Sequence, residues 1–281
     1  MTKEELDFIK SAFDFLEKPS FITKVTDYLG KPVEMTVNKL PQKIQKKLVT
    51  VSELALKKSL LMANETLLSN DHSDELAEKL KNGRLSRIGH NLAAVTTGAV
   101  GGLFGGPGAI IEIPVTTTLI MRSILSQGQT YGNLTKEELI TNALYVFSLG
   151  SNRSDQDDDM SSAYYSSRIA MEMTLKRAAG YMASHSPNQV LKSIEAGSAP
   201  FVLELIKKVA TRFNITVSEK MIAQSIPIVG AGAGATLNLL FTDFFSLSAK
   251  YHFGLMNLEQ KYGRDEVRRA YQEMQNGLKT P

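Results

Sequence analysis

The 281-residue chain contains no cysteine and no tryptophan. The absence of cysteine excludes disulfides, thiolate zinc sites and cysteine nucleophiles, and it fits a reducing compartment. Without tryptophan a tryptophan belt at a membrane interface is excluded, and the nine tyrosines replace it only in part. Alternation of apolar and polar residues typical of strands is also scarce, so nearly every segment predicts helix. The sequence therefore predicts an all-α protein, folded as a single-domain helical bundle.

The excess of positive charge is small. The chain has 32 Lys and Arg against 29 Asp and Glu, a net charge of +3 that is too weak to indicate nucleic acid as a partner. The N-terminus reads Thr2-Lys3-Glu4-Glu5, which is a helix capping box and not the basic start of a signal peptide. We therefore expect a cytoplasmic protein.

Helix start and stop signals divide the chain further. Thr2 begins a first helix that carries Leu6, Ile9 and Phe13 at helical spacing, and Thr135 begins another with the same capping box. Residues 1–38 are expected to be an N-terminal helix and linker, and 39–281 the main helical domain. Further helices are expected at about 42–69, 73–82, 160–184, 236–262 and 264–275, and the Thr135 helix should end near residue 149.

The expected helix at 42–69 is basic on one side. Its apolar stripe comprises Ile44, Leu48, Val51, Ala55 and Met62. An adjoining stripe carries Lys39, Lys43, Lys46, Lys47, Lys57 and Lys58. Such a helix either packs its apolar stripe into the core with a solvated lysine face, or lies on an anionic membrane surface.

Two glycine-rich stretches are the most unusual feature of the sequence. The first runs from Leu92 to Ile111 without a charge and ends at Glu112, and the second runs from Met221 to Thr242 and ends at Asp243. Each acid is followed nineteen positions later by Tyr-Gly, at Tyr131 and Tyr262. This offset of 131 residues indicates either an internal repeat or a chance agreement. A true repeat would give two central glycine-rich helical hairpins related by an approximate two-fold axis.

Small residues recur in these stretches at helical spacing, which allows close helix contact. They are Gly98, Gly102, Gly106, Gly230 and Gly234. Three interpretations remain open: a hairpin inside a soluble core, a hairpin that inserts reversibly into one leaflet, and a stable membrane span. The stretches are poor in Leu and Phe and are interrupted by proline, which weakens the last of these.

Glu112 and Asp243 are the main chemical candidates, because each is a lone acid in an apolar stretch. A bare carboxylate there would be neutral or paired, and Arg122 is the expected charge partner. The alternative is a catalytic site of Glu112, Asp243 and His252, acting in general acid and base catalysis or holding a divalent metal. No spacing matches a known metal-ligand motif and the four histidines are scattered, so no metal site and no cofactor are predicted.

Several runs resemble the EcsC family of bacterial proteins. They are Gly105-Gly106-Pro107-Gly108, Glu112-Ile113-Pro114, Tyr131-Gly132, Ile226-Pro227 to Gly234, Ala249 to Phe253, Leu258-Glu259 and Tyr262-Gly263, together with Arg122 and Asn238. The resemblance covers about residues 40–275. Family members often carry Asp at the position of Glu112, which keeps the carboxylate. The resemblance implies a helical cytoplasmic protein associated with the membrane, encoded beside an ABC transporter pair linked to secretion, for which only a peptidase or other hydrolase role has been suggested.

We therefore expect a cytoplasmic accessory protein that attaches peripherally to the inner membrane face or to a membrane transporter or secretion system. The lysine stripe and the two uncharged stretches motivate this hypothesis. The alternatives are a hydrolase that uses the carboxylate and histidine site, and a lipid-handling or pore-forming protein. The expected partners are a membrane surface or a membrane protein and no nucleic acid, and a homo-oligomer is left open.

Overall fold

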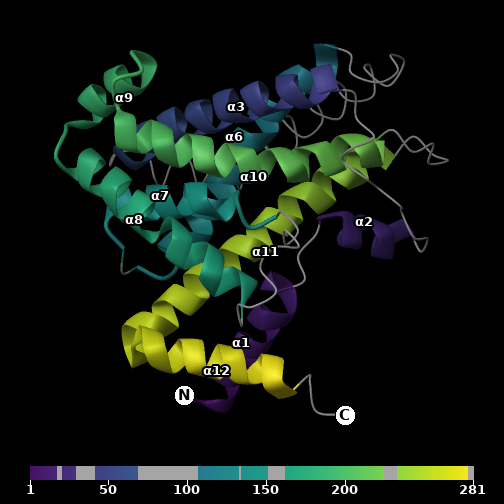
Figure 1. The fold of residues 1–281 in the computed structure, drawn as a ribbon, viewed down its shortest axis with the longest axis vertical. Helices are drawn as coiled ribbons and strands as arrows, with labels where there is room; N and C mark the ends of the chain where they lie inside the picture. Colours follow the sequence, from purple (N-terminus) through teal and green to yellow (C-terminus); the bar gives the residue numbers. More distant parts are fainter. Residues whose placement is uncertain are drawn as a thin grey trace, which may run out of the picture.

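The computed structural model describes residues 1–17, 21–29, 42–68, 107–132, 134–150, 162–224 and 233–277, and within these residues the fold is all-α (Figure 1). The helices are α1 (Lys3–Leu16), α2 (Phe21–Leu29), α3 (Gln42–Leu68), α6 (Pro107–Gln129), α7 (Lys136–Val146), α8 (Ala163–Ala183), α9 (Pro187–Glu195), α10 (Pro200–Gln224), α11 (Ala233–Tyr262) and α12 (Arg264–Gly277). The predicted fold class, a single-domain helical bundle, is confirmed.

Both predicted capping boxes begin helices. The Thr2 side chain accepts a hydrogen bond from the Glu5 backbone N–H at the start of α1, and Thr135 does the same with Glu138 at the start of α7. α7 ends at Val146, short of the expected 149, and the chain continues as turns through residue 150. The expected helix at 73–82 lies outside the described residues.

The N-terminal linker is shorter than expected, because residues 21–29 form α2. Phe21 and Val25 lie one helical turn apart and are both fully buried. The Phe21 ring packs edge-on against Phe241 of α11, with a distance of 5.1 Å between ring centroids. Burial of two apolar side chains outweighs the weak helical signal of this short segment. The expected division near residue 38 falls outside the described residues.

α3, α10 and α8 form a layer. α10 contacts both of the other helices, and Figure 1 shows α10 between them. Leu48, Val51 and Ala55 of α3 are buried, where α3 packs against α6 and α10. The core-packing interpretation of the apolar stripe on α3 is therefore confirmed.

α11 crosses the molecule and contacts the helices on both sides of the core (Figure 1). Phe241, Phe244, Phe245 and Phe253 project from it and are almost completely buried. α6 lies alongside α11, where the hydroxyl oxygens of Ser123 and Ser246 are 3.4 Å apart. α11 therefore provides four buried phenylalanines, more buried aromatic side chains than any other described helix.

The two Tyr-Gly sequences have the same role at the ends of α6 and α11. Gly132 has φ of 66° and Gly263 has φ of 87°, a left-handed conformation that favours glycine. Gly98, Gly102, Gly106 and Gly230 lie outside the described residues, and so do the contacts of Gly234 in the first turn of α11. The glycine-rich hairpins and their approximate two-fold axis therefore remain predictions.

Among the described residues, none of the helices combines the length and the apolar character needed to cross a bilayer.

Two glycines inside helices should respond in opposite ways to alanine. A Cβ atom at Gly128 would lie 2.3 Å from Leu139 and 2.9 Å from Phe253. A Cβ atom at Gly180 would have open space around it, with no neighbouring atom within 4 Å. Gly128→Ala should lower the free energy of unfolding by about 1–3 kcal/mol through overpacking. Gly180→Ala should raise it by about 0.5–1 kcal/mol through helix propensity. Chemical denaturation measures both, and a loss of stability in both variants would contradict this packing.

Candidate functional site

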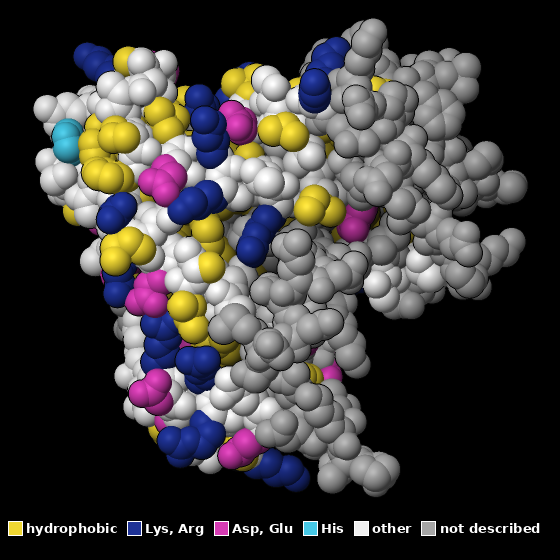
Figure 2. Space-filling model, viewed as in Figure 1, with side chains coloured by type: hydrophobic (Ala, Val, Ile, Leu, Met, Phe, Trp, Pro, Cys, Tyr) yellow, Lys and Arg dark blue, Asp and Glu magenta, His cyan; other side chains and the backbone are white. Residues whose placement is uncertain are grey.

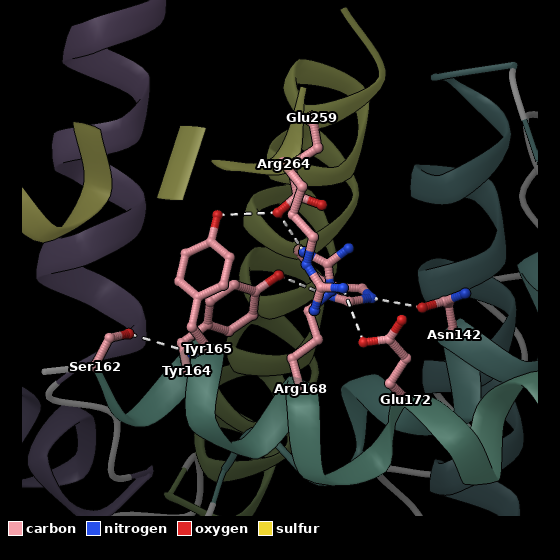
Figure 3. Close-up of polar contacts among 9 residues, drawn as sticks. Asn142, Ser162, Tyr164, Tyr165, Arg168, Glu172, Glu259 and Arg264 are labelled. Carbon is pink, nitrogen blue, oxygen red and sulfur yellow. Dashed lines mark hydrogen bonds and ion pairs between the residues drawn. The ribbon is translucent and has the colours of Figure 1, made fainter. Parts of the chain in front are cut away.

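His252 is the centre of a buried polar cluster between α7, α8 and α11. Its side chain is 0% exposed. The Tyr164 hydroxyl lies 2.9 Å from Nδ1, and Asn142 Oδ1 lies 3.1 Å from Nε2 (Figure 3). The Asn142 amide nitrogen donates to the Glu138 carbonyl, so Oδ1 faces the ring. An amide oxygen only accepts, hence Nε2 carries the proton and Nδ1 accepts from the Tyr164 hydroxyl.

The surroundings of His252 favour the neutral imidazole. Tyr145 packs against the ring with a centroid distance of 5.1 Å. Burial, and to a lesser extent the positive charge of Arg168, lowers the pKa of His252 well below its usual value of 6.5. His252 is therefore a neutral, doubly hydrogen-bonded side chain at neutral pH.

A buried ion pair lies next to this cluster. Arg168 Nη1 of α8 and Glu259 Oε1 of α11 are 2.6 Å apart, and their side chains are 13% and 8% exposed. The Tyr165 hydroxyl donates to the same carboxylate oxygen at 2.9 Å. Burial, followed by the negative charge of Glu259, raises the pKa of Tyr165, which keeps this phenol protonated as a donor.

The N-terminus of α8 is bound by a carboxylate from α1. Glu17 accepts hydrogen bonds from the Ser162 hydroxyl at 2.6 Å and from the backbone N–H groups of Ala163 and Tyr164 at 2.8 and 3.2 Å. A negative charge is favourable at a helix N-terminus, where backbone donors point outward. Burial and the charge of Glu17 also raise the pKa of Tyr271 on α12. Glu17, which caps the C-terminus of α1, thus connects α1 to α8.

The cluster ends in solvent at Glu172 of α8. Its carboxylate accepts from Lys176 and from Arg264 of α12, both at 2.8 Å. These hydrogen bonds, with Lys176 as the larger contribution, lower the pKa of Glu172 to about 2. Figure 3 shows Arg264 reaching Glu172 beside the Arg168 and Glu259 pair. The last turn of α11 and the first turn of α12 are thereby fixed to α8.

Asp243 does not lie in the interior, and the prediction of a buried carboxylate is wrong for this residue. Its side chain is 59% exposed and bonds Lys24 of α2 at 3.1 Å, not Arg122. Nine residues separate Asp243 from His252, which is two and a half helical turns and places them on opposite sides of α11. The structure therefore does not bring these two predicted catalytic residues together.

The other predicted site residues are only partly described. Glu112 lies in α6, and its side chain is outside the described residues. Arg122 is half-buried, and its Nε atom is buried without a hydrogen bond among the described residues. The predicted pairing of Glu112 with Arg122 stays a prediction.

The geometry of the described cluster is structural in character. His252 meets a phenol and an amide but no carboxylate, and its polar atoms are already bonded within the chain. Among the described residues, no group of three or more His, Asp and Glu could hold a metal ion. A cavity of about 200 Å³ lies away from this cluster, between Glu4, Phe8, Tyr131 and Leu258.

Sequence reasoning missed most of the cluster. Tyr164, Tyr165 and Arg168 lie close together in sequence, but their partners are about ninety residues away on α11. In the sequence Glu259 stands in the Leu258-Glu259 run that resembles the EcsC family, and no local pattern there indicates its pairing with Arg168. The one usable signal is helical phase, because His252 and Glu259 are seven residues apart and share one side of a helix.

The fold and this cluster define an all-α protein whose α7, α8 and α11 are joined by buried polar contacts. The family model of the EcsC protein family matches residues 7–255. The chain belongs to the EcsC family. No curated protein and no solved structure matches it.

The stability of the protein should depend on the charge of His252. Because the pKa of His252 is lowered on folding, the unfolded state binds the proton more readily below pH 6.5. The contribution to the free energy of unfolding is complete above about pH 6.5 and is lost as the pH falls toward the folded pKa. His252→Gln should be less stable than the wild type at pH 8. Between pH 6.5 and 5 it should not show the loss of stability that protonation of His252 causes in the wild type.

Denaturation curves at closely spaced pH values measure this effect. His185→Gln is the control, because it removes an exposed histidine and leaves His252 in place. Parallel pH profiles of the wild type and His252→Gln would contradict the neutral buried imidazole.

Removing one negative charge should have different costs inside and outside the cluster. Glu259→Gln leaves the buried Arg168 guanidinium without a counter-charge, and we expect a loss of about 2–4 kcal/mol in the free energy of unfolding. Glu266 pairs with Arg269 where the side chains are 52% and 68% exposed, so Glu266→Gln should cost less than about 0.5 kcal/mol. Similar losses in urea denaturation would show that the Arg168 and Glu259 pair is not buried.

Proposed function

We propose that this EcsC-family protein is an accessory protein that attaches peripherally to the inner, anionic face of a membrane. The observation that carries the proposal is the placement of charge. α3, α8 and α10 together contain twelve Lys and Arg and five Asp and Glu, a net charge of +7. The whole chain carries only +3, so the remainder is negative. α3, α10 and α8, which form one layer (Figure 1), therefore carry the excess positive charge of the chain, with Arg168 and Lys220 turned inward and the other described cations nearer the surface.

The exposed lysines of α3 support the proposed attachment to an anionic membrane face. Because the apolar stripe of α3 is buried, Lys46, Lys47 and Lys58 remain exposed and Lys57 is half-buried; the Lys43 side chain is outside the described residues. Each lysine or arginine close to an anionic leaflet contributes about 1 kcal/mol of attraction, and this attraction falls off within a Debye length of the surface. Binding through these lysines is electrostatic and sensitive to salt.

The association with a transporter or secretion system that the family resemblance implies is a finer form of the same proposal. A protein held at the membrane surface by its basic layer can contact the cytoplasmic side of a membrane protein. Crosslinking in cells followed by mass spectrometry would identify such a partner, and a set of crosslinked proteins without membrane proteins would contradict it.

The hydrolase alternative has less support. Asp243 is exposed and paired with Lys24, and His252 is enclosed by the core on the other side of α11. Glu112 alone remains of the proposed catalytic set, and its side chain lies outside the described residues. None of the contacts described favours a pore-forming role.

Charge reversal on α3 tests the membrane attachment. The triple variant Lys46→Glu, Lys47→Glu and Lys58→Glu should bind anionic phospholipid vesicles at least tenfold more weakly than the wild type at low salt, because three attractive charges become repulsive. Vesicle co-sedimentation over a series of salt concentrations measures the effect. The matched control, Lys3→Glu, Lys10→Glu and Lys250→Glu, changes the same net charge at exposed positions of α1 and α11.

We expect the control to bind nearly as well as the wild type. Failure of the wild-type protein to bind anionic vesicles at low salt would overturn the proposed attachment, and equal weakening by the two triple variants would show that only net charge matters.

A further inference from the structure

α8 and α10 run antiparallel and form one continuous surface. Arg212 donates to the Ser167 hydroxyl at one end of the pair, and Lys208 Nζ donates to Thr174 Oγ1 at 2.8 Å near the middle. At the other end the rings of Tyr181 and Phe201 are 6.5 Å apart. The outer sides of the two helices therefore adjoin along their length, on the face seen in Figure 2.

Three large apolar side chains are exposed on this surface. Ile169 and Met173 of α8 are 40% and 60% exposed, and Phe201 of α10 is 39% exposed. Ile169, Met173 and Arg177 follow one another at a spacing of four residues, so they lie on one side of α8. Figure 2 shows hydrophobic side chains interspersed with Lys and Arg over this face and not gathered in one apolar patch.

The cations of this surface are in excess over its acids. Lys176, Arg177, Lys207 and Lys208 are all exposed. The two acids are already bonded: Glu172 accepts from Lys176 and Arg264, and Glu204 bonds Lys208 at 2.8 Å. Among the described residues, Arg177 and Lys207 have no hydrogen-bonded carboxylate.

We infer that the outer side of the α8 and α10 pair is the surface that enters the headgroup region of an anionic bilayer, with Ile169, Met173 and Phe201 inserted and Arg177 and Lys207 bound to lipid phosphates. This inference rests on the proposed membrane attachment and extends it. On α3 one large apolar side chain, Leu54, is exposed beside the lysines, whereas the α8 and α10 pair offers three such anchors. Cations around single apolar side chains suit the bilayer interface, where charged headgroups border hydrocarbon.

A protein partner fits this surface less well. The core of a protein interface gathers apolar side chains together and is depleted in lysine. Here Ile169 and Met173 are neighbours on α8 and Phe201 lies apart on α10, and exposed Lys and Arg side chains surround them (Figure 2). An acidic protein is therefore the alternative occupant, and the experiment distinguishes it.

Two variants with matched controls test the inference by vesicle co-sedimentation. The first, Ile169→Ser, Met173→Ser and Phe201→Ser, removes the apolar anchors without changing the charge. Its control is Leu6→Ser, Val115→Ser and Leu239→Ser, at side chains that are 37%, 45% and 71% exposed on other helices. The second, Arg177→Gln and Lys207→Gln, removes two charges, and its control is Lys10→Gln and Lys250→Gln. Denaturation curves confirm that all four variants fold.

The anchor variant should lose the part of vesicle binding that persists at high salt and should bind at least fivefold more weakly at low salt. The charge variant should bind about 25-fold more weakly at low salt, since each cation near an anionic leaflet contributes roughly a fivefold factor. Both controls should stay within about twofold of the wild type.

Each failure has a distinct meaning. If the wild type binds vesicles and the α8 and α10 variants match their controls, the attachment stands and this surface is not its docking face. If the wild type does not bind vesicles at all, the proposed attachment fails and the inference fails with it. In that second case an acidic protein becomes the occupant that the charge of this surface favours.

Discussion

One side of α11 carries two polar groups into the core, and the arrangement of the neighbouring helices depends on bonding them. His252 and Glu259 are seven residues apart and therefore share a side of the helix. An unbonded buried imidazole or carboxylate would cost more free energy than most packing errors. The chain meets this constraint with Asn142 from α7 and with Tyr164, Tyr165 and Arg168 from α8. α7 and α8 are thereby held in one register against α11.

Polar contacts also hold α8 against α1 and α12. Glu17 from α1 binds the N-terminus of α8, and Arg264 from α12 binds Glu172 one turn beyond Arg168. α8 is thus fixed on its inner side by residues from α1, α11 and α12. Its outer side makes few such contacts and is free to carry Ile169, Met173 and Arg177. The polar core therefore determines where the outer surface of the α8 and α10 pair lies.

Much of the fold could be predicted from local signals, because capping and amphipathic periodicity act within a few residues. The capping boxes at Thr2 and Thr135 and the apolar stripe of α3 are of this kind. α2 was missed because its stability comes from Phe241 and Phe244, which no local signal reveals. The buried position predicted for Asp243 is wrong because the absence of charge along a stretch does not imply burial of the residue that ends it.

The partners of His252 could not be predicted at all. Tyr164 lies 88 residues away in the sequence and Asn142 lies 110 residues away, so only the tertiary fold brings them to the ring. Helical phase would have excluded a joint site of Asp243 and His252, since nine residues along a helix reverse the side that a residue faces. Helical phase thus predicts which residues of one helix cannot share a site, but it does not predict which residues of other helices meet them.

Stability alone does not account for the concentration of positive charge on α3, α8 and α10. Exposed ion pairs such as Lys208 with Glu204 contribute little free energy, so they do not explain an excess of cations. A sequence selected only for folding would intersperse the two signs of charge more evenly over the surface. In the core, the charges of Arg168 and Glu259 are matched within the chain. On the outer layer Lys207 has no hydrogen-bonded carboxylate among the described residues, and Arg177 has only the electrostatic attraction of Glu204, which Lys208 already bonds. Stronger counter-charges for these two cations are therefore to be sought outside the protein.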